Sequence, residues 1–72
     1  MTIASGYASH AEGLENEAKG DASHVEGYSN IAEGMYSHAE GYFTRANEDY
    51  SHTEGYGTVA DAIGAHAEGL GA

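Results

Sequence analysis

The sequence predicts an all-β solenoid in which short parallel strands of one 72-residue chain stack as successive coils. Three observations support this fold class. One motif returns at a fixed step of 14 residues, small side chains alternate with polar ones inside it, and glycine is too frequent for a helix. The chain is then expected to form about five coils of 14 residues, each with two short strands.

The repeat unit is Ser-His-Ala-Glu-Gly, and no insertion interrupts its five copies. Alanine replaces the serine in the last copy, and Val25 and Thr53 replace the central alanine in two others. All five histidines of the chain occupy the second position of the unit. A weaker copy, small/polar-x-Ala-x-Gly, lies halfway between successive units. No linker or change of composition divides the chain, so residues 1–72 are expected to form a single repeat domain. The copies are centred on residues 9–13, 23–27, 37–41, 51–55 and 65–69.

A coiled coil is the main alternative for a half-repeat of seven residues. Its heptad positions would place Asp21 and Asp49 in the apolar seam. They would also place nearly all eleven glycines inside a helix. At about 0.8–1 kcal/mol each relative to alanine, the total would be comparable to the whole stability of a small domain. The helical interpretation is therefore disfavoured.

Each copy fits a strand of about five residues. In such a strand Ser, Ala and Gly share one face, and His and Glu share the other. The two residues that follow are expected to turn the corner, with glycine permitting the backbone angles. The interior would then hold only Ala, Ser, Thr and Gly, and the two sheets would lie close together. Glu48 is an expected irregularity because it replaces a corner glycine.

The composition excludes several functions. Leu, Ile, Val and Phe number only 8 of the 72 residues, which without the repeat would predict disorder. The net charge of −10 argues against binding to nucleic acid or to anionic membranes. The absence of cysteine excludes disulfides and cysteine-based zinc sites. No run of residues is long and apolar enough to insert into a membrane.

The tandem Ser-His-Ala-Glu-Gly units and their small-x-Ala-x-Gly halves resemble the head repeats of trimeric autotransporter adhesins, the YadA-like or haemagglutinin-type repeats. The same motif occurs in bacteriophage tail fibres and neck appendages. The resemblance covers residues 2–71 and implies a left-handed parallel β-roll that assembles as a side-by-side homotrimer. It also implies a structural or adhesive role outside the cell, at a virion or bacterial surface.

The repeated His and Glu positions are the first candidate site. We expect them to form two outward columns, and we interpret that face as a subunit interface with His–Glu contacts between chains. A His-x-Glu pair can also ligate zinc, but the continuous array marks out no closed site, so no metal or other cofactor is predicted. Nothing supplies a pocket or a nucleophile, so the chain is not expected to be an enzyme. The columns are His10, His24, His38, His52 and His66, and Glu12, Glu26, Glu40, Glu54 and Glu68.

Tyrosines are the second candidate site, because they recur at two positions that the strand interpretation places at corners. Such corners could bind a glycan or a host receptor, or they could cover the roll and fill gaps between protomers. The first corner holds Tyr28, Tyr42 and Tyr56, and the second holds Tyr36 and Tyr50.

The resemblance therefore implies a rigid spacer or surface-presenting head in a trimeric extracellular fibre, whose partners are other copies of the same chain. The first alternative is a module that binds a host-surface glycan or receptor through the corner tyrosines. The second is the subunit of a self-assembling filament, because the two ends of a roll would expose unpaired strand edges.

Overall fold

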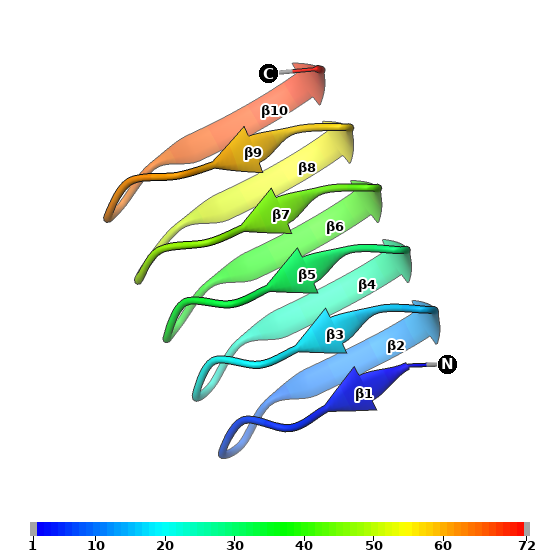
Figure 1. The fold of residues 1–72 in the computed structure, drawn as a ribbon, viewed down its shortest axis with the longest axis vertical. Coiled ribbons are helices and arrows are strands. Elements are labelled where there is room, and N and C mark those ends of the chain that lie inside the picture. The colour runs from blue at the N-terminus through cyan, green and yellow to red at the C-terminus, as the bar shows by residue number, and fades with distance from the viewer. Residues whose placement is uncertain (1, 72) are drawn as a thin grey trace.

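The computed structural model describes residues 2–71, which form ten β-strands. Figure 1 shows the coils as successive rungs, each with one short strand and one long strand. The short strands are β1 (Ile3–Ala4), β3 (Glu17–Ala18), β5 (Ile31–Ala32), β7 (Arg45–Ala46) and β9 (Val59–Ala60). The long strands are β2 (His10–Leu14), β4 (His24–Tyr28), β6 (His38–Tyr42), β8 (His52–Tyr56) and β10 (His66–Leu70).

Strands of equal length stack into two parallel sheets, ordered β1-β3-β5-β7-β9 and β2-β4-β6-β8-β10. Each strand pairs in register with the strand one coil away, so that His24 lies beside His38 and Tyr28 beside Tyr42. The Cα atoms span 27 × 24 × 10 Å, which makes the solenoid flat. The predicted all-β solenoid of about five 14-residue coils is confirmed. The described residues contain no helix with the length and apolar character needed to cross a membrane.

The prediction of two five-residue strands per coil is wrong for one sheet. The long strands have five residues, but the short strands have only two. The short strands end early because the next two N–H groups converge on one carbonyl: the Lys19 and Gly20 amides both donate to the Ala32 oxygen, at 2.9 and 3.3 Å. The Ser23 hydroxyl then donates to the Gly20 carbonyl at 2.7 Å and closes the turn.

Small side chains fill the space between the sheets, as predicted. In the inner coils the central alanines of both sheets are buried, and so are most serines of the repeat. The prediction that the interior holds only Ala, Ser, Thr and Gly is wrong, because Val25, Asn16 and Asn30 are also fully buried. A chain with few large apolar residues therefore packs a thin interior that includes polar groups.

The buried asparagines are stabilised by hydrogen bonds within and between coils. Asn30 Nδ2 donates to the carbonyl oxygens of Glu26 and Gly41, at 2.8 and 2.9 Å. Its Oδ1 accepts from the Thr44 amide and hydroxyl, at 2.8 and 2.7 Å. These bonds offset the cost of removing the amide from water. Thr44 and Thr58 continue the column in the following coils, on the inward side that the sequence predicts.

Glycine supplies backbone angles just before the corner, where the repeat glycines have φ of 104–115°, and it also permits the close stacking of the coils. Corner residues with left-handed φ are mostly not glycine, and they include Ala22, Ser29 and Tyr36 with φ of 56°, 57° and 61°. By contrast, a Cβ on Gly41 would lie 2.1 Å from the carbonyl oxygen of Gly55 in the next coil. The long strands can stack at this spacing only because that position carries no side chain.

Glu48 marks the irregular coil that the sequence predicts. It occupies the position that Gly34 holds one coil earlier, where a Cβ would lie 2.1 Å from a carbonyl oxygen. At Gly34 the Ala46 carbonyl accepts two N–H groups, including that of Gly34. One coil later, among the residues described, the Ala60 carbonyl accepts the Asn47 amide alone. We infer that room for the Glu48 side chain is made at the expense of one backbone hydrogen bond.

Candidate functional site

The outer face of the long-strand sheet carries three columns of side chains, and we call it the ladder face. Alternate residues of a strand point to the same side, so β4 presents His24, Glu26 and Tyr28 outward. In-register pairing repeats this arrangement from coil to coil. The first column holds His10, His24, His38, His52 and His66, and the second holds Glu12, Glu26, Glu40, Glu54 and Glu68. The third holds Leu14, Tyr28, Tyr42, Tyr56 and Leu70.

The His and Glu columns are in direct contact within each coil. Each His Nε2 lies 2.9–3.1 Å from the Oε1 of the glutamate two residues later. Imidazole rings of successive coils have centroids 4.5–4.7 Å apart. The side chains of His38 and His52 are about one-third exposed, whereas those of His10 and His66 are more than half exposed. The predicted columns are present, and their contacts lie within one chain; contacts between chains remain a prediction.

The packing also affects the titration of His38. Burial lowers its pKa from the usual 6.5, and the imidazoles of His52 and His24 lower it further, while Glu40 and Glu26 act in the opposite direction. Within residues 2–71, the buried Nε2 atoms of His38 and His52 have no aligned hydrogen-bond partner. His38 therefore favours the neutral imidazole.

Tyr28, Tyr42 and Tyr56 lie at the ends of strands and not at a corner, which corrects the sequence prediction. Strand pairing continues through the preceding glycine, so each tyrosine is the last residue of a long strand and shares the outward side of His and Glu. Successive tyrosine rings are nearly parallel with centroids 5.0 Å apart. Phe43 packs edge-on against Tyr42, with centroids 4.5 Å apart. The ladder face thus gains an aromatic column that the sequence analysis had separated from it.

Tyr36 and Tyr50 do occupy a corner, as predicted. Their φ values are 61° and 63°, and their rings stack with centroids 5.3 Å apart. Both side chains are more than half exposed. In both tyrosine columns a ring covers the face of its neighbour, so a sugar can stack only on the outer face of an end ring. Ring edges and hydroxyl groups are the remaining contacts for a ligand.

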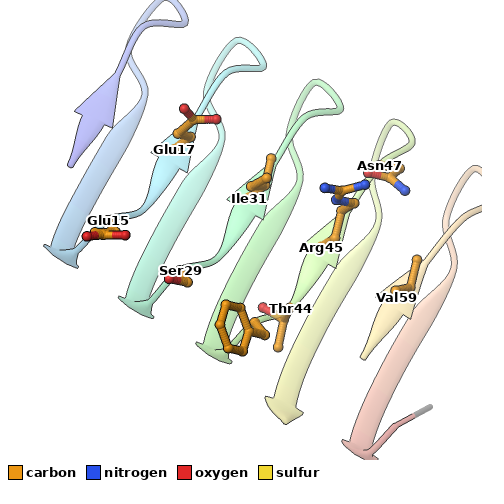
Figure 2. A pocket seen from close by; sticks show the side chains of 9 residues that line it. Glu15, Glu17, Ser29, Ile31, Thr44, Arg45, Asn47 and Val59 are labelled. Atoms are coloured by element: carbon orange, nitrogen blue, oxygen red, sulfur yellow. The ribbon is translucent and has the colours of Figure 1, made fainter. Parts of the chain in front are cut away.

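The outer face of the short-strand sheet differs from the ladder face, and the sequence analysis assigned no site to it. It holds a shallow groove of about 530 Å³, in which Figure 2 places Arg45 with Ile31 and Val59. Among the described residues, Arg45 has no carboxylate within 4.0 Å, whereas Lys19 lies 3.6 Å from Glu17. The outward residues of successive short strands share no common type: Ile3, Glu17, Ile31, Arg45 and Val59.

In comparisons with known proteins, no family model, curated protein or solved structure matches this chain. The likeness to adhesin head repeats therefore rests on the sequence motif alone. The expectations that the chain is not an enzyme and uses no cofactor likewise remain predictions. Chemically, the ladder face offers imidazole nitrogens and carboxylate oxygens in a close array beside an apolar and aromatic column.

Proposed function

We propose that this chain is a structural or adhesive β-roll module of a trimeric extracellular fibre, either a phage tail fibre or appendage or the head of a bacterial adhesin. In this role it is a rigid spacer, or a head that presents surfaces away from the virion or cell. The observation that carries the proposal is the ladder face, where the outward His and Glu recur in every coil.

The short-strand sheet supports this argument by contrast. Its outward positions stack in the same register, yet they hold apolar, acidic and basic residues in turn, such as Ile31, Glu17 and Arg45. The stacking of strands is therefore compatible with apolar, acidic or basic residues at outward positions. The recurrence of His and Glu on the ladder face has a cause beyond stacking: the two side chains contact each other within each coil, and contact with other copies of the chain would supply a second cause.

The apolar column of the ladder face also favours a protein interface. Leu14 is 51% exposed, Tyr42 is 38% exposed and Leu70 is 80% exposed, and they belong to one continuous column. A contiguous apolar surface of this kind is typical of protein–protein contacts. In a side-by-side trimer, the ladder face would bury this column against a neighbouring copy.

Sedimentation equilibrium over a wide range of concentrations tests the proposal. The complex should have three times the 7.5 kDa mass of one chain. Tyr42→Asp puts a charge into the ladder face and should dissociate the complex. Val59→Asp, a matched change at an exposed position of the short-strand sheet, should leave the mass unchanged. A monomeric wild-type chain, or equal behaviour of the two variants, would contradict the proposal.

The exposed Tyr36–Tyr50 pair favours a second candidate function, the binding of a glycan or receptor at the corner. A glycan array tests it with the wild-type chain and with Tyr36→Ala and Tyr50→Ala. Binding that both substitutions abolish would support a recognition module. Binding that both variants retain would exclude the corner as the contact.

A further inference from the structure

The ladder face contains overlapping sets of metal ligands that come from neighbouring coils. In each set, one ring nitrogen from each of two successive histidines and one carboxylate oxygen of a glutamate lie within 4.8 Å of one another. Sequence reasoning considered the His-x-Glu pair inside one strand and therefore missed ligands contributed across coils. The sets are His10–Glu12–His24, His24–Glu26–His38, His38–Glu40–His52 and His52–Glu54–His66.

We propose that the ladder face binds zinc, or a similar divalent transition-metal ion, through two histidines of neighbouring coils and the glutamate of the first. Two imidazole nitrogens and one carboxylate oxygen are a donor set that zinc uses in open tetrahedral sites, where water takes the fourth position. Magnesium and calcium prefer oxygen ligands and gain little from imidazole. The donor set is therefore selective for transition metals.

The geometry of the central set is close to that of a zinc site. With bonds of about 2.0–2.2 Å, the ligand atoms of a tetrahedral site lie roughly 3.4 Å apart. Glu40 Oε1 lies 2.9 Å from His38 Nε2 and 4.0 Å from His52 Nε2, which brackets that separation. The two imidazole rings are nearly parallel, so one must tilt to direct its lone pair at the ion. Both side chains are about one-third exposed and have space to do so.

The surroundings also favour a cation. The chain has a net charge of −10, and every long strand carries a glutamate and no lysine or arginine. The buried Nε2 atoms of His38 and His52, which lack an aligned hydrogen-bond partner among residues 2–71, would gain the ion as a partner. All three ligands of a set belong to one chain, so this inference does not depend on the proposed trimer.

The overlap of the sets determines how many ions can bind. Each ion uses two adjacent histidines, and a neutral imidazole has only one nitrogen lone pair to give, so the row of five histidines holds at most two ions. Without His38 the row keeps two separate adjacent pairs and the same capacity. Without His24, His10 is isolated and the capacity falls to one ion. Adjacency, not the number of histidines, controls binding.

Isothermal titration calorimetry of the full chain with zinc chloride near neutral pH tests the inference. We expect two zinc ions per chain for the wild type and for His38→Gln, and one for His24→Gln. The most informative comparison uses two double variants that each keep three histidines. His10→Gln/His66→Gln keeps them adjacent and should bind one ion, whereas His24→Gln/His52→Gln keeps them isolated and should bind none.

Circular dichroism without metal verifies that each variant is folded, and if a double variant is not, His24→Gln against His38→Gln makes the same comparison. An absence of zinc binding by the folded wild-type chain would overturn the inference. Binding that follows the number of histidines rather than their adjacency would also overturn it. Magnesium chloride is the control for general attraction to a negative surface, and a response to magnesium equal to that for zinc would be a third contradiction.

Discussion

The two sheets of the solenoid share one stacking geometry but differ in what they present to solvent. Both are parallel and in register, with each residue beside its equivalent one coil away. The long-strand sheet presents His and Glu in every coil, whereas the short-strand sheet presents residues as different as Ile31 and Arg45 at one position. The fold therefore accepts different residue types at outward positions, whereas it restricts the residue type at inward positions and at the glycines. The His and Glu of each coil contact each other within the chain, and the proposed assembly adds a second reason for their recurrence.

The largest expected effect concerns the glycine positions of the two sheets. Gly41 in the long-strand sheet has φ of +115° and no room for a Cβ, so Gly41→Ala should lower the free energy of unfolding by about 3 kcal/mol or more. Gly34 lies beside the short strands at a position where a later coil carries Glu48. Gly34→Ala should therefore cost about 1 kcal/mol, the value of one hydrogen bond. Urea denaturation of both variants measures the difference, and equal losses would contradict the distinction between the sheets.

The second prediction concerns Asn30, which joins the long strands to the next coil. Asn30→Leu would remove the Asn30 side-chain partner of the Glu26 and Gly41 carbonyls and of the Thr44 amide. We expect a loss of about 2–4 kcal/mol in the free energy of unfolding. Asn30→Thr is the matched control, because Thr44 occupies the same column, and it should cost less than half as much. A similar loss in both variants would indicate that shape, and not hydrogen bonding, matters at this position.

The third prediction concerns how the free energy of unfolding depends on pH through His38 of the ladder face. The pKa of His38 is lower in the folded chain than the ordinary 6.5, chiefly because of burial. The unfolded chain then takes up a proton at a higher pH than the folded chain. The contribution of His38 to stability is therefore fully present above about pH 6.5 and is lost as the pH falls toward the folded pKa.

Urea denaturation between about pH 8 and pH 5, with a chelator present, measures this effect as the difference between the wild type and His38→Gln. On acidification the wild type should lose more stability than the variant. Parallel curves, or a wild type that becomes relatively more stable in acid, would contradict the assigned direction.

Much of the fold follows from the repeat, because a strict step of 14 residues fixes which residues stack. Periodicity correctly placed the Ser23 and Thr44 side chains inside and the His24 side chain outside. It could not find where strand pairing stops, because that depends on two amides that share one carbonyl. It also misjudged Asn30, since an asparagine that is usually exposed is buried here by hydrogen bonds from neighbouring coils.

The candidate sites likewise include features that the sequence could predict and features that it could not. The His and Glu columns could be predicted because alternation along a strand is a local property. The metal-ligand sets could not, because they depend on how far apart Nε2 and Oε1 atoms of different coils lie. Tyr28 was assigned to a corner because pairing was expected to stop at Gly27, whereas it continues one residue further. The groove around Arg45 combines residues of several coils and leaves no repeated signal in the sequence.

The smallest expected effect concerns the outward side chains of the short-strand sheet. Lys19 lies 3.6 Å from Glu17 and 4.0 Å from Glu33, and all three side chains are substantially exposed. Exposed ion pairs contribute little, so Lys19→Gln should lower the free energy of unfolding by less than about 0.5 kcal/mol. Added salt should remove even that difference, because it screens charges near solvent. Urea denaturation at low and high salt measures both values. A loss above about 1 kcal/mol would mean that stability depends on which residues lie on the outer side of this sheet. The contrast in residue type between the two sheets would then no longer support the proposed role of the ladder face.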